Sequence, residues 1–340
     1  MKIVIDNKIR FLGDKLSKYA ETVFLPGREI THQSIIDADA LLVRTRTRCD
    51  AQLLDNTKVK FIATATIGFD HIDTEYCKKN NIFFTNAPGC NSGSVAQYIA
   101  SALVSLQNAF HLDLTKQTLG IIGCGHVGSK VIKTALNLGM NVIVYDLPLQ
   151  DNNFNDFELC NLKYLQKNAD IITFHVPLIS DGRYKTLNMC NSEFIKNLKH
   201  NAVIINTSRG QVVNNSDLLQ ALNNGDILTS VLDVWENEPD INLDLLDKVF
   251  AATPHIAGYS VDGKAEATRM TVESLDKFFK LGIEDFKADL SPFNVPVLDY
   301  NNIKDVLKTY NILSDSDLLK ANPDKFEFFR EHYPARRENL

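Results

Sequence analysis

Residues 118–146 read TLGIIGCGHVGSKVIKTALNLGMNVIVYD, and this segment decides the fold. An apolar strand comes first, then Gly123-Cys124-Gly125-His126-Val127-Gly128, then a helical pattern, and finally a second apolar strand that ends in Asp146. The first glycine permits a tight turn, the second lets a pyrophosphate approach the backbone, and the third lets helix and strand pack closely. The context of strand, turn and helix therefore predicts a dinucleotide site.

The type of dinucleotide follows from the acid at the end of the second strand. Asp146 lies eighteen residues after Gly128, where a carboxylate can accept hydrogen bonds from a ribose diol and repels a 2′-phosphate. The N-terminus of the helix offers free N–H groups to the phosphates. We therefore predict NAD as the cofactor. The alternative, a purely structural glycine-rich turn, requires strand, helix and acid to coincide by chance. The predicted cofactor contacts are Gly123, Gly125, His126, Val127, Gly128 and Asp146.

Short apolar runs alternate with helix-compatible stretches along most of the chain. Runs of this kind lie at residues 2–6, 38–45, 59–66 and 81–89, and again at 169–177, 201–210 and 229–235. Such alternation predicts parallel sheets with crossover helices. The fold class is therefore α/β, with two Rossmann-like doubly wound parallel-sheet domains, a cleft between them and a short C-terminal tail.

Composition limits the function classes. The 340 residues carry a net charge of −6, which argues against nucleic acid or an anionic membrane as a partner. Six cysteines without a C-x-x-C pair are typical of reduced thiols rather than a disulfide frame or metal site. The chain has neither a signal-peptide pattern nor an apolar run long enough to span a membrane. We expect a cytoplasmic protein.

Three polar residues follow strands of the NAD-binding region. Arg209 follows VIINTS, Glu238 follows VLDVWEN, and His255 follows VFAATP. An arginine can grip a carboxylate through two hydrogen bonds, a histidine can move a proton near neutral pH, and a carboxylate can fix the histidine tautomer. Each also has a structural alternative: a turn cap for Arg209, a solvated acid for Glu238 and a satisfied core imidazole for His255. Together, behind a nucleotide fingerprint, they favour a hydroxy-acid dehydrogenase.

The blocks LGIIGCGHVGSKV, INTSRGQVVNNSDLLQAL, LDVWENEP and TPHIAGYSVDGKAEAT resemble the D-isomer-specific 2-hydroxyacid dehydrogenases. The resemblance implies Arg209 as carboxylate anchor, Glu238 as partner acid and His255 as acid/base. It also implies a first domain completed by chain after His255. The expected bounds are 1–94 with 258–285 for substrate, 95–257 for NAD, and 286–340 for the tail. The further NAD contacts that it implies are His175, Thr207, Asp233 and Gly258.

Other stretches, including DADALLVRTRT, FIATATIGFDHID and PHIAGYSVDGKA, resemble a narrower group of this family that acts on 4-phospho-D-erythronate. That resemblance implies Thr45, Thr66 and Tyr259 as substrate contacts. Arg44, Arg46 and Arg48 alternate, so in an extended segment they would share one face and could bind a phosphate. Arg44, at the strand end, is the favoured contact. A solvated basic loop is the alternative for the other two arginines.

The expected reaction is oxidation to 2-oxo-3-hydroxy-4-phosphobutanoate in pyridoxal 5′-phosphate synthesis. The tail is similar to the end of a dimerisation region but shorter, so we expect a homodimer. Two other functions remain open. One is a dehydrogenase for another D-2-hydroxy acid, such as 3-phosphoglycerate. The other is a non-catalytic NAD-sensing interaction protein on the same fold.

Overall fold

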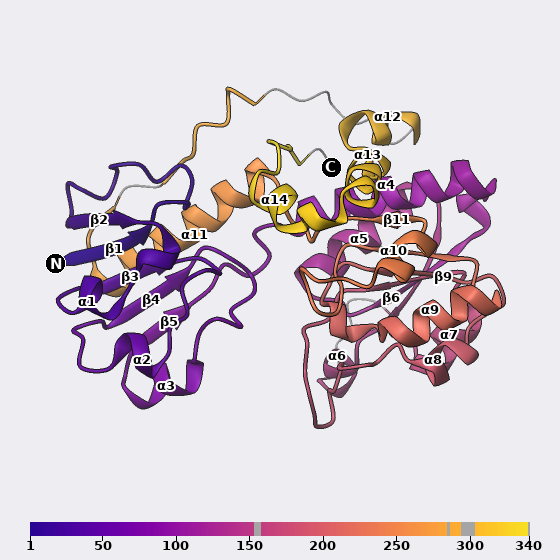
Figure 1. Ribbon diagram of the computed structural model, residues 1–340, viewed down its shortest axis with the longest axis horizontal. Coiled ribbons are helices and arrows are strands. Elements are labelled where there is room, and N and C mark those ends of the chain that lie inside the picture. Colours follow the sequence, from indigo (N-terminus) through magenta and orange to yellow (C-terminus); the bar gives the residue numbers. More distant parts are fainter. Residues whose placement is uncertain (153–157, 284–285, 294–302, 339–340) are drawn as a thin grey trace. The chain divides into compact units, whose positions relative to one another are not determined.

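A computed structural model describes residues 1–152, 158–283, 286–293 and 303–338 of the chain. These residues divide into two compact units (Figure 1). The first unit contains residues 1–91 and 260–294, and the second contains residues 92–259 and 295–340. Each unit is described by itself below.

The first unit is built on a five-stranded parallel sheet of order β2-β1-β3-β4-β5. The strands β1, β3, β4 and β5 fall within the predicted apolar runs, whereas β2 was not predicted. Because β2 lies at the sheet edge and none of its residues is fully buried, it lacks the continuous apolar pattern of its neighbours. The bounds are Lys2–Asp6 for β1, Glu21–Leu25 for β2, Ala40–Val43 for β3, Phe61–Thr64 for β4 and Phe83–Thr85 for β5.

The second unit has a six-stranded parallel sheet of order β11-β10-β9-β8-β6-β7. The strand order reverses between β6 and β8, which is the place where parallel α/β sheets bind ligands. The predicted fold class, with two parallel-sheet α/β domains, is confirmed. The bounds are Thr118–Ile122 for β6, Asn141–Tyr145 for β7, Ile171–Phe174 for β8, Val203–Asn206 for β9, Thr229–Leu232 for β10 and Ala251–Ala252 for β11.

Helices accompany both sheets. Those between strands of one sheet make the crossover connections that parallel strands require, whereas the helix before β6 and the helices after β11 do not connect strands of one sheet. In the first unit they are α1 (His32–Ile35), α2 (Ala51–Leu54), α3 (Thr74–Lys79) and α11 (Val261–Phe279). In the second unit they are α4 (Ser92–Phe110), α5 (His126–Asn137), α6 (Leu147–Asp151), α7 (Leu162–Asn168), α8 (Ser192–Lys196), α9 (Asn215–Asn224), α10 (Leu243–Lys248), α12 (Ile303–Thr309), α13 (Ile312–Ala321) and α14 (Phe326–Glu331).

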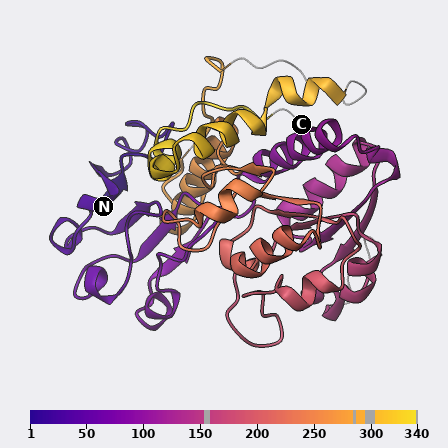
Figure 2. The ribbon, with the colours of Figure 1, turned by 45° about the vertical axis from the view of Figure 1, so that its right-hand side comes forward.

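Helix α4 is buried along its first fifteen residues. Alanines and serines make up much of that stretch, so neighbouring elements can approach it closely. Apolar residues of α4, β6, α5 and α12 form one hydrophobic cluster of the second unit. Figure 2 shows the yellow C-terminal helices α12 and α13 close to the purple helix α4, with which both make contact.

The C-terminal segment is joined to the second unit by specific hydrogen bonds. Ser101 Oγ of α4 accepts a hydrogen bond from the backbone N–H of Ile312 at 3.0 Å. Ser316 Oγ of α13 accepts one from the N–H of Ala252 in the edge strand β11, also at 3.0 Å. The tail thus covers an edge that would otherwise expose an unpaired donor. Residues 294–302 and 339–340 of the predicted tail lie outside the described residues.

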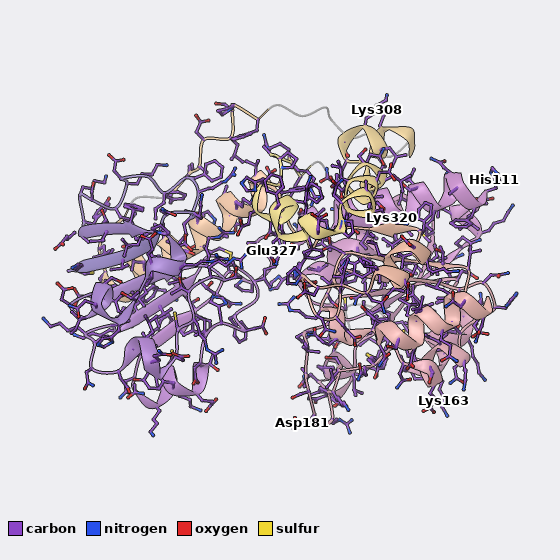
Figure 3. The ribbon with its side chains drawn as sticks, in the orientation of Figure 1. His111, Lys163, Asp181, Lys308, Lys320 and Glu327 are labelled. Atoms are coloured by element: carbon purple, nitrogen blue, oxygen red, sulfur yellow. The ribbon has the colours of Figure 1, made fainter. Side chains whose placement is uncertain are left out.

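Charged side chains such as Lys163 and Lys308 point outward from the second unit (Figure 3). Among the helices that the structure describes, none is both long and apolar enough to cross a membrane. In the same residues no group of histidine, cysteine or acidic side chains is arranged to hold a metal ion. All six cysteines lie in the described part of the chain, and none forms a disulfide.

Candidate active site

The glycine-rich turn after β6 has the geometry that its three glycines predict. Gly123 has a φ of +93°, and a Cβ on it would lie 2.5 Å from the carbonyl oxygen of His175. A Cβ on Gly128 would overlap the carbonyl of Gly123. By contrast, a Cβ on Gly125 would meet no atom within 4 Å. Two glycines are therefore required for packing, and the third leaves open space beside an exposed backbone.

The remaining features of the turn suit an anionic dinucleotide. Helix α5 begins at His126 with no side chain capping its N-terminus. Its first N–H groups are thus available for phosphate. The Asp146 carboxylate accepts hydrogen bonds from Cys124 N at 2.8 Å and Leu149 N at 2.9 Å, which orients it against the turn. Each carboxylate oxygen can accept further bonds, so a ribose diol can still bind there. These residues fit NAD.

A second polar group lies at the switch point of the sheet. His175 follows β8, and its Nε2 lies 3.0 Å from Thr173 Oγ1 while its Nδ1 lies 3.4 Å from the hydroxyl of Thr207. Burial lowers the pKa of His175 to about 3, so the ring is neutral at neutral pH. The imidazole therefore acts as a hydrogen-bonding group beside the glycine turn rather than as a charge.

Glu238 and His255 form a direct pair. His255 Nδ1 lies 2.8 Å from Glu238 Oε2, and the other oxygen of Glu238 accepts a hydrogen bond from Trp235 N at 2.9 Å. Burial alone would raise the pKa of Glu238, but the hydrogen bond and charge of His255 outweigh it and the pKa is lowered. An ionised Glu238 makes Nδ1 of the ring the donor. Nε2 is then left to accept a proton.

The turn that carries His255 is held by Asp233. This carboxylate is 1% exposed and accepts hydrogen bonds from Ile256 N at 2.7 Å, Ala257 N at 2.9 Å and Thr253 Oγ1 at 2.6 Å. His255 itself has a φ of +57°, an unusual conformation for a residue with a side chain. Asp233 therefore orients the turn. Thr253 also contacts the hydroxyl of Tyr98 at 2.7 Å, and sequence reasoning missed both residues.

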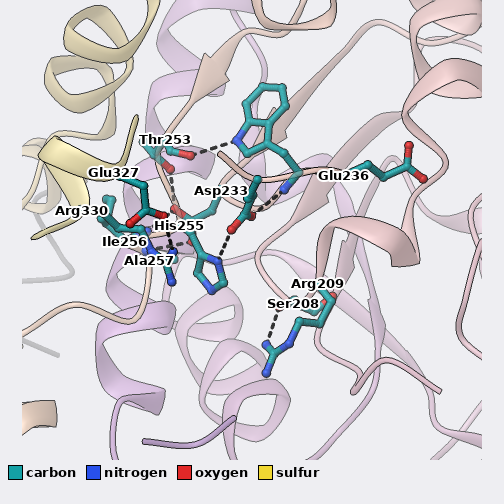
Figure 4. A network of polar contacts seen from close by, with 12 residues as sticks. Ser208, Arg209, Asp233, Glu236, Thr253, His255, Ile256, Ala257, Glu327 and Arg330 are labelled. Carbon is teal, nitrogen blue, oxygen red and sulfur yellow. Dashed lines mark hydrogen bonds and ion pairs between the residues drawn. The ribbon is translucent and has the colours of Figure 1, made fainter. Parts of the chain in front are cut away.

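Arg209 lies at the start of the loop after β9. Asn206 binds the carbonyl of Arg209 through its side-chain amide at 2.9 Å, and Arg209 Nη1 donates to the carbonyl of Ser208 at 2.8 Å. In Figure 4 the guanidinium of Arg209 and the imidazole of His255 point into the same part of the site. The structure thus places Glu238 and His255 in direct contact, and Figure 4 shows Arg209 in the same close view.

The C-terminal helix α14 adds a charged pair that the sequence did not predict. Arg330 Nη1 lies 3.2 Å from Glu327 Oε1, and Figure 4 places both residues beside the His255 turn. The positive charge of Arg330 is among the influences that lower the pKa of Glu238. No sequence motif connects residues so far apart, so only the folded chain identifies this contribution.

The remaining predicted residues after His255 lie in the same turn. Gly258 is half-buried, and the backbone N–H of Tyr259 donates to Ile256 O at 2.8 Å. The Tyr259 ring packs edge-on against Tyr333 of the tail, with 6.1 Å between ring centroids. The tail therefore packs against a predicted substrate contact.

In the first unit, the segment after β3 differs from expectation. Thr47 N donates to Arg44 O at 3.2 Å, so residues 44–47 form a turn. The expectation that Arg44, Arg46 and Arg48 share a face in an extended segment is therefore wrong, because the turn reorients successive side chains. Arg48 is exposed and forms an ion pair with Asp50 at 2.8 Å. Arg44 is half-buried and Thr45 is exposed at the end of the strand.

Thr66 belongs to a short chain of polar contacts after β4. Its hydroxyl lies 2.7 Å from Thr64 Oγ1 and donates to Gly68 O at 2.8 Å. Thr64 Oγ1 in turn lies 3.0 Å from His71 Nε2. Burial lowers the pKa of His71 to about 4, so this ring is also neutral near pH 7. Thr64 and His71 lie within the quoted FIATATIGFDHID block, but sequence reasoning gave them no role.

The sequence is similar to a family of dehydrogenases and to individual members of it. Residues 95–257 match the family model for the D-isomer specific 2-hydroxyacid dehydrogenase, NAD binding domain. An erythronate-4-phosphate dehydrogenase of Bacteroides fragilis is 49% identical over 339 residues, covering 99% of this chain and 97% of the relative. A protein of the same name from Escherichia coli is 38% identical over 351 residues, covering 99% and 92%.

Solved structures with similar folds include two dehydrogenases with NAD bound. D-lactate dehydrogenase of Aquifex aeolicus, complexed with NAD and lactic acid, has a TM-score of 0.67 and 27% identity, covering 82% of this chain and 96% of its own. NAD-bound 3-phosphoglycerate dehydrogenase of Entamoeba histolytica has a TM-score of 0.69 and 26% identity, covering 85% and 99%. The fold and the relatives thus point to one family.

Proposed function

Because this chain is a member of the D-isomer-specific 2-hydroxyacid dehydrogenase family and is an NAD-dependent oxidoreductase, we propose that it oxidises 4-phospho-D-erythronate. The product is 2-oxo-3-hydroxy-4-phosphobutanoate, an intermediate of pyridoxal 5′-phosphate synthesis. The substrate assignment is supported by the relatives from Bacteroides fragilis and Escherichia coli, which match nearly the full chain.

One observation carries the proposed chemistry, namely the 2.8 Å contact between Glu238 and His255 Nδ1. A carboxylate on Nδ1 leaves Nε2 of the neutral ring as a base and stabilises the imidazolium that forms when the ring takes up a proton. His255 therefore removes the proton of the C2 hydroxyl. When bound, NAD accepts the hydride that leaves C2. The alcohol is oxidised to a ketone and the proton remains on His255.

Substrate anchors are assigned by charge and by position at strand ends. Arg209 binds the carboxylate through its planar guanidinium, which suits a bidentate contact. Arg44, Thr45 and Thr66 of the first unit bind the phosphate, and Tyr259 contacts the remainder of the substrate. The half-buried position of Arg44 supports its choice over Arg48, whose charge is already paired with Asp50.

NAD contacts are assigned around the switch point of the second sheet. The turn from Gly123 to Gly128 binds the pyrophosphate, with His126 and Val127 supplying helix N–H groups, and Asp146 binds the adenosine ribose. His175, Thr207, Asp233 and Gly258 contact the rest of the cofactor. In this proposal residues 95–257 serve NAD binding, and residues 1–94 with 258–285 serve substrate binding.

The proposal includes a homodimer in the cytoplasm. Two large apolar side chains of the tail, Leu318 and Phe328, are more than half exposed, which supports an interface between copies of the chain. Light scattering on the purified protein tests the assembly. A monomer at micromolar concentration contradicts the dimer.

The decisive experiment is a substrate panel assayed by NADH formation. The panel contains 4-phospho-D-erythronate, unphosphorylated D-erythronate, 3-phospho-D-glycerate and D-lactate, each with NAD and with NADP. We expect kcat/KM to be highest for 4-phospho-D-erythronate with NAD. D-Erythronate and D-lactate lack the phosphate, and NADP carries a 2′-phosphate that Asp146 repels. 3-Phospho-D-glycerate carries both anionic groups but is one carbon shorter, so it tests the distance between the phosphate and carboxylate contacts. Preference for 3-phospho-D-glycerate would reassign the substrate.

A non-catalytic NAD-sensing protein is the competing function from another class. Such a protein would not need Arg209, Glu238 and His255 in one site, and their convergence favours an enzyme. NAD binding without turnover of any member of the panel would support the sensing role instead.

A further inference from the structure

Arg336, in the segment after α14, is a buried cation. Its side chain is only 6% exposed. Nη2 donates to the carbonyl oxygen of Ala257 at 2.6 Å, to that of Ile256 at 3.3 Å, and to the hydroxyl of Ser94. The guanidinium carbon lies 4.3 Å from the ring centroid of Tyr310 and 5.7 Å from that of Tyr333.

This environment is unusual for an arginine because no carboxylate in the described part of the chain forms an ion pair with it. Asp315 is connected to Arg336 only through the two tyrosines that contact the guanidinium. It accepts hydrogen bonds from the hydroxyls of Tyr310 at 2.9 Å and Tyr333 at 2.7 Å. Among the described residues, Nε and Nη1 of Arg336 have no hydrogen-bond partner. Burying such a cation is unfavourable. Arg336 nevertheless donates hydrogen bonds to the carbonyls of Ile256 and Ala257, which an apolar side chain could not do.

The two carbonyls belong to the turn that begins at His255. The peptide group joining Ile256 to Ala257 gives its N–H to Asp233 Oδ2 at 2.9 Å and its carbonyl to Arg336 at 3.3 Å. The carbonyl of Ala257 also accepts a hydrogen bond from Ser94 Oγ at 2.8 Å. A carboxyl group thus holds the donor side of the turn, and a cation holds the acceptor side.

We propose that Arg336 is a positioning residue for His255, which it serves by fixing the Ile256–Ala257 backbone on the side opposite Asp233. His255 has a φ of +57°, a conformation that the surrounding contacts must maintain. Loss of the guanidinium leaves two carbonyls buried without a charged donor. The turn then relaxes, and the imidazole no longer stays aligned with Glu238. This inference rests on the proposed role of His255 as the base.

The test uses two substitutions in the full-length protein. Arg336→Met keeps an unbranched apolar stem but removes the guanidinium and with it every donor, and Arg336→Lys keeps one charged donor group. A hydrogen bond to a charged group shifts an equilibrium by a factor of about 10 to 100. Because this bond holds the turn in the conformation that aligns His255, we expect kcat of Arg336→Met to fall by about the same factor. Arg336→Lys should recover part of the loss. NAD affinity should fall less than kcat, since the glycine turn that binds the pyrophosphate is untouched and only the contacts of Asp233 and Gly258 border the relaxed turn.

Two controls separate positioning from general loss of tail packing. Leu319→Ala truncates a fully buried tail residue that belongs to a different hydrophobic cluster from Tyr310. Lys325→Ala removes an exposed charge beside Asn322. Comparison is made at temperatures where Arg336→Met and Leu319→Ala are equally folded by circular dichroism. Amide exchange at Ala257 and the NMR signals of the His255 ring report the turn directly, independent of turnover.

The proposal predicts faster exchange at Ala257 and a shifted His255 signal in Arg336→Met but not in Leu319→Ala. Addition of ethylguanidinium to Arg336→Ala should restore part of kcat. Equal kcat and equal Ala257 exchange in Arg336→Met and Leu319→Ala would overturn the proposal. If the wild-type protein oxidises no substrate, the proposed function fails, while the exchange and NMR measurements still decide the role of Arg336.

Discussion

Gly210 lies against the carbonyl group of Trp235 so closely that a methyl group on its α-carbon would overlap that carbonyl. The contact joins two loops of the second unit. Arg209 immediately precedes Gly210, and the N–H of Trp235 is bound by Glu238 at 2.9 Å. The spacing between the proposed substrate anchor and the acid that orients the proposed base is therefore fixed by one glycine.

Substitution of Gly210 tests this link. Gly210→Ala forces the Arg209 loop away from Trp235, which should lower the free energy of unfolding by about 1–3 kcal/mol. It should also lower kcat/KM more than it lowers NAD affinity, because the glycine turn lies elsewhere. Unfolding can be followed by the fluorescence of Trp235, the single tryptophan of the chain. Wild-type stability together with wild-type kcat/KM would show that the loops are not coupled.

The glycine turn predicts opposite effects at two of its positions. Gly125→Ala places a methyl group in open space, so stability should stay within about 0.5 kcal/mol of wild type. NAD binding should nevertheless weaken, because that space is where the pyrophosphate approaches. Gly128→Ala overlaps the carbonyl of Gly123 and should destabilise the second unit even without NAD. Titration calorimetry and thermal unfolding of both variants distinguish the two effects.

Most of the fold could be predicted because parallel strands buried on both faces carry continuous apolar runs. Residues 171–174 and 203–206 are buried throughout, and both lie within predicted strands. Edge strand β2 could not be found in this way, because its residues are partly exposed and lack the signal. The turn at residues 44–47 was missed for another reason. The alternating arginines gave a period of two, although a local hydrogen bond closes the backbone there.

The contact between Glu238 and His255 could be predicted, because each residue follows a strand of the same sheet and its type suits an acid–base pair. Contacts that depend on tertiary packing were not accessible. Arg336 meets Ile256 across 80 residues of sequence, and no local pattern announces that contact. Asp233 was expected only at the cofactor, but its buried carboxylate also shapes the His255 turn through two backbone N–H groups.

The proposed base can be tested separately from cofactor binding. His255→Asn should lower kcat by about 100- to 10,000-fold, the usual contribution of a general base, with NAD affinity nearly unchanged. Stopped-flow measurement of NADH formation checks kcat, and calorimetry checks NAD affinity. A variant that retains near-wild-type turnover would exclude His255 as the base.

Glu238→Gln tests the partner acid. The amide can still occupy the position beside Nδ1, but it cannot stabilise the imidazolium by charge. We expect a lower kcat, and the acid limb of the pH profile should move to lower pH because the protonated ring loses its counter-charge. Unchanged pH dependence would mean that Glu238 does not act on the base.

Cofactor preference depends on Asp146. Asp146→Asn keeps an oxygen that can accept from Cys124 N or Leu149 N, and it removes the charge that repels a 2′-phosphate. The ratio of kcat/KM for NAD to that for NADP should therefore fall by about tenfold or more. The ratio is measured with one substrate at fixed concentration. An unchanged ratio would place the discriminating group elsewhere.

His175 makes stability depend on pH in a direction fixed by its burial. Burial lowers the pKa of this ring from 6.5 to about 3, so between these values the unfolded chain binds a proton that the folded chain does not. The contribution is present above about pH 6.5 and is lost as pH falls toward 3. From about pH 7 to about pH 5 the free energy of unfolding of the second unit should fall by about 2 kcal/mol through this group alone.

The measurement is denaturant unfolding at several pH values, followed by Trp235 fluorescence, which reports the second unit. His175→Gln keeps a polar side chain beside Thr173 and Thr207 but does not titrate. The variant should show a shallower dependence of stability on pH than wild type between about pH 7 and about pH 5. The comparison uses slopes rather than absolute stabilities, so any packing cost of the substitution cancels. Equal slopes would show that His175 takes up a proton in the folded protein as readily as in the unfolded chain, and its assignment as a neutral hydrogen-bonding group at the cofactor site would then fail.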